Sequence, residues 1–402
     1  MPSRIVLMTG GVETLTYFSK ELGKTFEEKG YRVFYYDLKE TEVCFSRLKR
    51  FLKPGETVLV TFNHIGLCQE ALLYHPQYGY IWEQFQIPVY NIVVDHPLYY
   101  HNHLSNPVKQ YHYIGIDRQH IRYVENYYPK VKICGFLPLA GMELSEKSAG
   151  MKDHGKTPEE KVEKRDIPVL FTGNYQVPEK FNQYIERVDE EYTRFYHKII
   201  DEVLTQSEET LEEVARKFCI QEMGEISDAE FAEVLAHMNF LDLYVRNTRR
   251  GNVIRTLIDA GIPVEVVGDG WEKLKCSHPE LLKIHPQADT QTCLEMMQRT
   301  QVSLNVMPEF KDGAHDRVFS SILNGAVSVS DESIYLREIL PEGMGICYYD
   351  RNCLEKLPEL VRELLELRDK RNEIVRKGYE KVSAGHTWKS RAEQLISWIE
   401  SV

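Results

Sequence analysis

Two stretches of this chain repeat one arrangement, in which short apolar segments of strand length alternate with amphipathic helical segments. At the start, residues 5–8 are apolar and lead into a glycine pair, after which Leu15, Phe18, Leu22 and Phe26 recur at helical spacing. Such alternation predicts parallel sheets that are covered by helices on both faces, the doubly wound α/β class. In that class, ligands bind beyond the carboxyl ends of the strands.

The pattern predicts two domains with a polar connection between them. We expect an N-terminal domain over residues 1–150, a second domain over 166–385, and a C-terminal helix over 386–402 that returns to the first domain. About 178–245, the pattern is helical without strands, which predicts a helical insert in the second domain. Strands are expected near 4–9, 31–38, 57–62, 88–95, 111–116, 130–136, 167–172, 264–267, 282–285, 302–306 and 326–330.

Composition excludes several classes of protein. The chain has 61 acidic against 49 basic residues, a net charge of −12, from which we predict that nucleic acid is not a partner. Apolar runs are far too short for a membrane span, and the N-terminus has no stretch typical of a signal peptide, so a cytoplasmic location is expected. The eight cysteines lack zinc spacing and are expected to be free thiols.

The ends of the first-half strands carry the candidate catalytic groups. Glu13 follows the first strand and its glycine turn, and Asp95 and His96 follow the fourth. A carboxylate or imidazole there could act as a general base. The alternative is structural, with Asp95 as a cap and His96 opening a turn before proline. The glycine pair does not form G-x-G-x-x-G, so no dinucleotide cofactor is expected.

In the second half, glycine-rich turns follow the strands, and an arginine opens the helix near 318–323. Backbone amides at helix N-termini and a guanidinium group are suited to the oxygens of a diphosphate. A set of motifs stands in order: Gly173-Asn174-Tyr175, Val267-Gly268-Asp269-Gly270, His285-Pro286, Asp316-Arg317-Val318-Phe319, Asn324-Gly325-Ala326 and Gly385-His386-Thr387-Trp388.

This ordered set resembles the second domain of GT-B glycosyltransferases, which have two Rossmann-like domains facing across a cleft, and in particular the spore-maturation CgeB-like glycosyltransferases. The segment Val94–Tyr99 is similar to the accompanying first domain. The resemblance implies a nucleotide-diphosphate-sugar donor, a UDP-sugar foremost, bound by the second domain, and a protein, cell-surface or other acceptor hydroxyl at the first. It implies donor contacts from Gly173, Asn174, Tyr175, Gly268, Asp269, His285, Asp312, Gly313, His315, Arg317 and Ser320.

One departure concerns two acidic positions. Many retaining members of the wider superfamily have glutamates where this chain has Asp312 and Ser320, and a hydroxyl cannot replace a carboxylate's charge-assisted bonds. No Asp-x-Asp follows a strand, so we expect transfer without a metal or other cofactor. Two alternatives stay open: a nucleotide-sugar epimerase on the same fold, and a non-catalytic nucleotide-sugar-binding scaffold protein.

Overall fold

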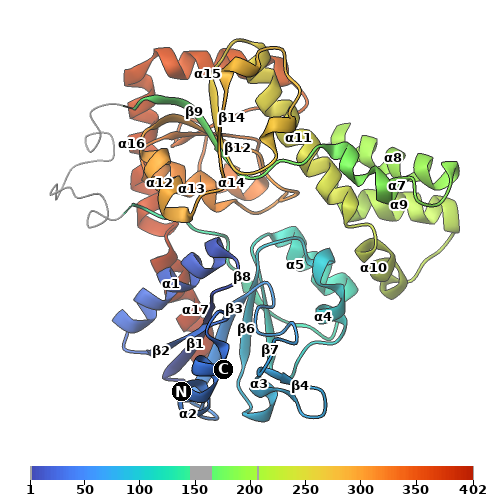
Figure 1. The fold of residues 1–402 in the computed structure, drawn as a ribbon, viewed down its shortest axis with the longest axis vertical. Helices are drawn as coiled ribbons and strands as arrows, with labels where there is room; N and C mark the ends of the chain where they lie inside the picture. The colour runs from blue at the N-terminus through green and yellow to red at the C-terminus, as the bar shows by residue number, and fades with distance from the viewer. Residues whose placement is uncertain (1, 145–164, 206–207, 402) are drawn as a thin grey trace. The chain divides into compact units, whose positions relative to one another are not determined.

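A computed structural model describes residues 2–144, 165–205 and 208–401 (Figure 1). The chain forms two compact units: one runs to Leu139 and includes the residues from Thr387 on, and the other is Ala140–His386. Each unit is built on its own six-stranded sheet. The sequence prediction of parallel α/β domains is confirmed. Most of the predicted polar connection lies outside the described residues.

The sheet of the first unit has the strand order β2-β1-β3-β6-β7-β8, with every neighbouring pair parallel. Residues of β1 and β3 are buried along their whole length because helices cover both faces, which explains their unbroken apolar runs. The strands are β1 (Arg4–Thr9), β2 (Arg32–Asp37), β3 (Thr57–Phe62), β6 (Val89–Val93), β7 (Tyr111–Gly115) and β8 (Lys132–Phe136).

Helices of the first unit follow the predicted apolar faces. The helix α1 (Glu13–Glu28) buries Leu15, Phe18, Leu22 and Phe26, the four residues that recur at helical spacing. Other helices are α2 (Thr41–Phe51), α3 (Ile81–Gln84), α4 (His101–Ser105) and α5 (Arg118–Tyr127), with the 3₁₀ helix η1 (Pro97–Tyr100). A small antiparallel hairpin, β4 (Tyr74–His75) with β5 (Gly79–Tyr80), escaped prediction because two-residue strands leave no periodic signal.

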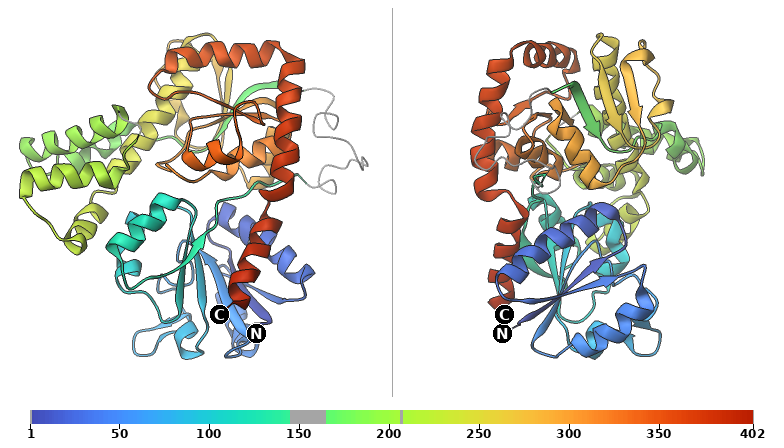
Figure 2. Two further views of the ribbon diagram at one scale, coloured as in Figure 1. Left: turned by 180° about the vertical axis from the view of Figure 1, so that it is seen from behind. Right: turned by 60° about the vertical axis from the view of Figure 1, so that its left-hand side comes forward.

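The last helix of the chain, α17 (Trp388–Glu400), belongs to the first unit and lies beside α1 (Figure 2). The ring of Trp388 lies 4.4 Å from that of Phe18. Arg391 Nε donates to the carbonyl oxygen of Pro138 at 2.6 Å. Burial of an aromatic pair and of a charge-assisted bond ties this helix to the first sheet.

The sheet of the second unit has the order β11-β10-β9-β12-β13-β14, again fully parallel. The chain moves outward from β9 through β10 to β11 and then returns to β12 on the other side of β9, so the topological switch point lies between β9 and β12. The strands are β9 (Ile167–Thr172), β10 (Val264–Val267), β11 (Leu282–His285), β12 (Thr300–Asn305), β13 (Val327–Ser330) and β14 (Ile346–Tyr348).

The helices of the second unit include the insert that the sequence predicted. The insert follows β9 and projects to one side of the sheet as a group of helices, drawn in green in Figure 1. It comprises η2 (Pro178–Phe181), α7 (Asn182–Ile185), α8 (Glu190–Thr205), α9 (Leu211–Met223) and α10 (Asp228–Ala236). The next helix, α11 (Phe240–Asp259), runs without a break from the insert back to the sheet, past the predicted boundary at 245.

Further helices cover the sheet of the second unit. They are η3 (Trp271–Lys273), η4 (Pro279–Leu281), α12 (Thr290–Gln298), α13 (Asp316–Leu323), α14 (Ile334–Ile339), η5 (Leu354–Lys356), α15 (Leu357–Glu366) and α16 (Arg368–Gly385). Among the described residues, no helix combines the length and the apolar character needed to cross a membrane.

Candidate functional site

The carboxyl ends of β9 and β12 flank the switch point of the second unit, where a doubly wound sheet binds its ligands. Arg317, in the first turn of α13, spans these two strand ends. Its Nε donates to Thr172 Oγ1 at 3.1 Å and its Nη1 to Asn305 Oδ1 at 2.6 Å. The guanidinium also lies 4.9 Å from the centre of the Phe171 ring. These contacts fix the cation at the switch point.

A second guanidinium, that of Arg250, reaches the same place from α11. It lies 5.8 Å from the centre of the Phe171 ring, and its Nη1 donates to the carbonyl oxygen of Asn174 at 2.8 Å. Burial, followed by repulsion from the charges of Arg246 and Arg317, lowers the pKa of Arg250 to about 9. Two arginines that repel each other in a desolvated place form a strong site for an anion.

Carboxylates near these arginines offset only part of the positive charge. Arg246 Nη2 lies 2.7 Å from Asp242 Oδ2. Asp316 Oδ1 lies 2.8 Å from His315 Nδ1; burial alone would raise the pKa of Asp316, but His315 and Arg317 outweigh it and lower that pKa. Burial and the charge of Arg317 lower the pKa of His315, so the ring is neutral near pH 7.

The sequence analysis missed Arg250 and its neighbour Arg246. Their signal is a cluster of basic residues, Arg246, Arg249 and Arg250, at the end of an acidic helical insert. The predicted insert ends at 245, and neither a strand nor a glycine turn is expected at 246–250, so nothing in the sequence analysis links these arginines to the strand ends. The continuous helix α11 carries these residues back to the sheet.

The glycine turns after β9 and β10 approach each other closely. Asn174 Oδ1 accepts from the backbone amide of Asp269 at 2.9 Å, and Gly173 N donates to Val267 O at 2.8 Å. Gly268 has φ +141°, and a Cβ there would lie 2.6 Å from Gly173 O, so no side chain fits. The structure thus brings four predicted residues together beside Arg250: Gly173, Asn174, Gly268 and Asp269.

Two residues that were predicted to bind the donor, Tyr175 and His285, make their described contacts away from the two arginines. Tyr175 is buried, and its ring stacks on that of Trp271 at 4.9 Å, inside the apolar core of the second unit. His285 Nε2 lies 2.7 Å from Glu265 Oε2, on the neighbouring strand β10. Their roles in donor binding stay predictions, and these contacts provide a structural role for each.

The remaining predicted residues lie in the turn before α13 and within α13 itself. His315 caps the helix, with Nδ1 3.2 Å from Arg317 N. Asp312 is buried, and Gly313 O accepts from Ser333 Oγ at 2.6 Å. Ser320 is 1% exposed, and its Oγ accepts from Met142 N at 3.1 Å. Ser320 therefore holds the segment that enters the second unit, and its contact with a ribose stays a prediction.

A buried ionic cluster anchors the same turn to the insert. Arg249 forms an ion pair with Glu309, and the two side chains are 7% and 3% exposed. Lys311 Nζ lies 3.6 Å from Glu309 Oε2, and Arg249 Nη2 donates to Val203 O in α8. Two neighbouring residues of α11 therefore have different contacts. Arg249 pairs with Glu309 in the turn before α13, whereas Arg250 lies at the carboxyl end of β9.

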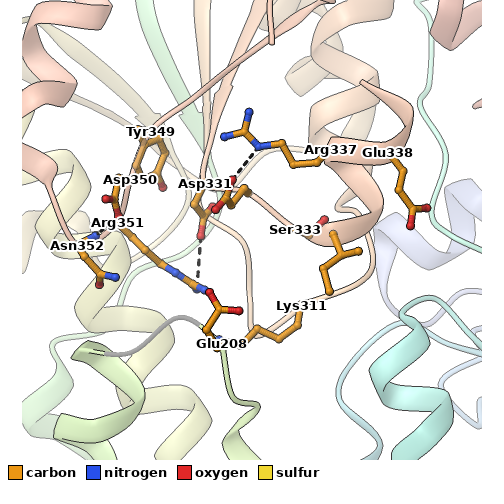
Figure 3. Close-up of a pocket in the computed structure, with 12 residues that line it drawn as sticks. Glu208, Lys311, Asp331, Ser333, Arg337, Glu338, Tyr349, Asp350, Arg351 and Asn352 are labelled. Atoms are coloured by element: carbon orange, nitrogen blue, oxygen red, sulfur yellow. Dashed lines mark hydrogen bonds and ion pairs between the residues drawn. The ribbon is translucent and has the colours of Figure 1, made fainter. Parts of the chain in front are cut away.

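A cavity of about 660 Å³ opens beside this cluster at the carboxyl ends of β13 and β14 (Figure 3). Asp331, which follows β13, and Arg351, which follows β14, form an ion pair of 3.8 Å on its wall. The Asp331 carboxylate is 2% exposed, and burial raises its pKa. The wall mixes cations and carboxylates. No group of three His, Cys, Asp or Glu side chains among the described residues is placed to hold a metal ion.

The first-unit candidates lie after β6 and at the start of α1. Asp95 Oδ2 accepts from Asn63 Nδ2 at 2.8 Å and from the Tyr100 hydroxyl at 3.2 Å. His96 caps η1, with its Nδ1 accepting from Leu98 N, and is 3% exposed. Glu13 is exposed in the first turn of α1. The structural alternative was a cap at Asp95, but in the described part of the chain Asn63 and Tyr100 hold this carboxylate.

Comparison with known proteins agrees with this geometry. A family described as glycosyl transferase-like matches residues 249–397, which include Arg250, Arg317 and the turn before α13. A search of curated protein sequences finds no match. The matched segment thus contains both arginines of the switch point.

Solved structures similar to the whole chain define the fold as that of the GT-B glycosyltransferases. An α-glucosyltransferase in complex with UDP-glucose and DNA is 15% identical, with a TM-score of 0.53, and the match covers 98% of this chain and 99% of that one. Sucrose-phosphate synthase from Thermosynechococcus elongatus is 11% identical (TM-score 0.53, 99% and 98% covered). T4 phage BGT with its UDP-glucose substrate is 13% identical (TM-score 0.52, 99% and 98% covered).

These structures correct one prediction. We had excluded nucleic acid as a partner because the chain is acidic, yet α-glucosyltransferase structures of this fold contain DNA. The exclusion is wrong because net charge sums over the whole surface. A nucleic acid contacts only one patch, whose local charge decides binding.

Proposed function

We propose that the protein is a glycosyltransferase that moves a sugar from a nucleotide-diphosphate donor to an acceptor hydroxyl. UDP-sugars are the favoured donors, and the acceptor is a protein, a cell-surface polymer or another hydroxyl-bearing molecule. The observation that carries the proposal is the convergence of Arg250 and Arg317 on Phe171, at the switch point of the second sheet. The glycosyl transferase-like match over the same residues supports it.

The two arginines would stabilise the leaving group. During transfer, the acceptor oxygen forms a bond to the anomeric carbon while the bond from that carbon to the diphosphate oxygen breaks. The electron pair of the broken bond leaves with the nucleoside diphosphate, whose negative charge increases. Cations that are already desolvated and fixed stabilise that charge more strongly than mobile ones in water do.

Part of the proposal is that no metal or cofactor is needed. Arg250, Arg317 and the backbone amides at the start of α13 together supply the positive charge that Mg²⁺ supplies in other phosphoryl sites. Asp312 and Asp316 are the carboxylates that would contradict this if they bound a cation.

The acceptor proton requires a base only if the configuration at the anomeric carbon is inverted. Asp95 is our first candidate, because Asn63 and Tyr100 orient its carboxylate through Oδ2 and leave Oδ1 for an acceptor hydroxyl. Glu13 and His96 are the other candidates. In a retaining enzyme, a diphosphate oxygen takes the proton. We also propose that the protein belongs to the CgeB-like subfamily and that it is located in the cytoplasm.

A thermal-shift screen tests donor binding. A ligand that binds only the folded protein raises the unfolding temperature, and the gain is about 2.7 kcal/mol at a ligand concentration one hundred times the dissociation constant. We expect a rise with UDP-sugars or with the guanosine, thymidine or cytidine equivalents, and none with free sugars at the same concentration. If no nucleotide sugar shifts the transition, the proposal is wrong.

Turnover then separates the enzyme from its alternatives. The active donor is incubated with acceptor mixtures of protein, polysaccharide and hydroxymethylated DNA, and the product is identified by mass spectrometry. DNA belongs in the panel because structural neighbours were solved with it. Epimer formation without an acceptor would identify an epimerase. Tight donor binding with no product across the panel would favour a scaffold protein.

A further inference from the structure

The first unit contains a cavity that is separate from the arginine site and whose lining is uncharged. It has a volume of about 430 Å³, within the range typical of small-molecule sites. Its walls come from the loop after β3, the β4–β5 hairpin, α4 and the start of β7. The lining includes three tyrosines, two histidines and three side-chain amides, but no Asp, Glu, Lys or Arg: His64, Cys68, Gln69, Tyr74, Tyr80, Asn102, His103, Asn106 and Tyr111, with Leu67, Pro107 and Val108.

A hydrogen-bonded chain fixes the proton on His64. Asn91 Oδ1 accepts from His64 N at 2.9 Å, which orients the amide so that Asn91 Nδ2 donates to the Tyr111 oxygen at 2.9 Å. Donation of the Tyr111 hydroxyl hydrogen to His64 Nε2, 2.9 Å away, is the arrangement in which that hydrogen is also paired. Burial raises the pKa of Tyr111, which keeps that hydrogen in place. The ring proton of neutral His64 therefore resides on Nδ1.

That Nδ1–H group has no hydrogen-bond partner among the described residues, although His64 is only 1% exposed. Burial, and then the charge of His103, lower the pKa of His64 far below its usual value, so the ring stays neutral. An unpaired buried donor is energetically unfavourable. A ligand hydroxyl that reaches Nδ1 and accepts from it would remove this cost.

His103 supplies a complementary acceptor. Its Nε2 lies 3.1 Å from the carbonyl oxygen of Leu67, and a carbonyl only accepts, so the ring proton is on Nε2. Nδ1 of His103 is then an acceptor. Burial lowers the pKa of this ring too, so it is neutral near pH 7. The two rings, whose centres are 4.6 Å apart, thus offer one donor and one acceptor.

The backbone around the cavity is held in an unusual conformation. Asn63, His64, Gln69 and Leu72 have positive φ, and among the described residues only two other non-glycine residues do. Left-handed backbone at such residues is energetically unfavourable and is concentrated at functional sites. His64 and Gln69 both line the cavity.

We propose that this cavity binds an uncharged saccharide, as the part of the acceptor next to the reacting hydroxyl. Neutral imidazoles and amides can donate to and accept from sugar hydroxyls, and the rings of Tyr74 and Tyr80, 4.9 Å apart, can cover the apolar face of a sugar. The only carboxylate in this loop, Glu70, accepts from the amides of Gly66 and Cys68. An ionised ligand would find no opposite charge on the lining.

The cavity is also connected to the proposed base. The ring of His64 lies 4.8 Å from that of Tyr100, whose hydroxyl donates to Asp95. Asn63, the residue before His64, donates to the same carboxylate oxygen. Asp95 does not line the cavity, so the acceptor role requires that a saccharide held by His64 extend past Tyr100 to Asp95. In this respect the inference rests on the proposed function.

Saccharide binding to the full chain, without donor, tests the inference by saturation-transfer NMR and calorimetry. The probes are maltose, cellobiose, lactose and N,N′-diacetylchitobiose, with glucuronic acid and thymidine for comparison. We expect at least one neutral disaccharide to bind, and Tyr74→Ala and Asn102→Ala each to weaken it at least fivefold. Tyr78→Ala is the matched control, because Tyr78 lies in the same hairpin, is 64% exposed and does not line the cavity.

The outcomes separate this inference from the proposed function. No binding of any neutral disaccharide, equal binding by all variants, or binding of thymidine or glucuronic acid alone would overturn it. Circular dichroism and unchanged affinity for the nucleotide donor show that a variant is folded. Intact donor binding and turnover without saccharide binding would refute only the cavity assignment. Saccharide binding without turnover under any donor would refute the glycosyltransferase and the acceptor role of the cavity, and would leave the cavity as a saccharide-binding site.

Discussion

Arg250 and Arg317 belong to different helices, yet their guanidinium groups lie 5.8 Å and 4.9 Å from the centre of one ring, that of Phe171 at the end of β9. Arg317 is buried and Arg250 is partly buried, and burial lowers the pKa of each. Two cations held together out of water are unfavourable unless an anion joins them. This relationship is the basis of the first prediction.

Replacing either arginine should weaken binding of the nucleoside diphosphate. A charge-assisted hydrogen bond contributes about 1.5–3 kcal/mol, so Arg317→Gln and Arg250→Gln should each raise the dissociation constant at least about tenfold. Calorimetry with UDP measures the effect. Arg376→Gln is the control, because Arg376 is an exposed arginine in α16 of the same unit. Unchanged affinity in a folded Arg250 variant would show that this cation does not meet the donor.

The ion pair of Arg249 and Glu309 should stabilise the turn before α13. Breaking a buried pair from one side leaves an uncompensated charge and costs about 3–5 kcal/mol, so Arg249→Met should lower the unfolding temperature markedly. The double variant Arg249→Met with Glu309→Leu should recover part of that loss, because it removes the carboxylate that Arg249 paired, while Lys311 loses its contact with Glu309. Calorimetric scans compare the three proteins. A double variant no more stable than the single one would contradict a direct interaction.

The first unit should lose stability in mild acid through His112. Burial, and then the charge of Lys132, lower the pKa of His112 to about 4. A histidine whose pKa is lowered by folding contributes stability that is present above its unfolded value of about 6.5 and is lost as the pH falls toward 4. His112→Phe keeps a ring against Tyr90 but cannot be protonated.

This variant should therefore lose less thermal stability than the wild type between pH 7 and pH 5. Differential scanning calorimetry measures both midpoints, and His75→Gln, at an exposed position of the same unit, is the control. Equal losses in the wild type and in His112→Phe would show that His112 does not titrate with folding.

Chelation should leave donor binding and turnover essentially unchanged. The proposed reason is that Arg250 and Arg317 supply the positive charge at the switch point that a divalent cation would otherwise supply. Activity with EDTA is compared with activity after adding Mg²⁺ or Mn²⁺. Loss on chelation and recovery with metal would contradict this, and variants of Asp312 and Asp316 would then identify the ligands.

Much of the fold could be predicted from local sequence. Strands such as β1 and β3 are buried on both sides, so their apolar runs have no gaps, and helix α1 shows its buried face as a simple repeat. Glycine turns after strands, and Arg317 at the start of α13, are equally local signals. The hairpin β4–β5 and the continuation of α11 past residue 245 could not be predicted from local sequence, since neither produces a periodic pattern of apolar residues.

The site itself depends on contacts between distant segments. Only the docking of α11 against β9 places Arg250 beside Arg317 and directs Arg249 to Glu309 instead. Tyr175 and Ser320 stand where family motifs predict donor contacts, which stay predictions, and only packing shows that Tyr175 stacks on Trp271 and that Ser320 accepts from the Met142 amide. The sequence specifies which helices and strands form, because the spacing of apolar residues along each segment reflects which of its faces is buried. Which side chains meet at the switch point follows from how those elements pack, and packing is decided only in the folded chain.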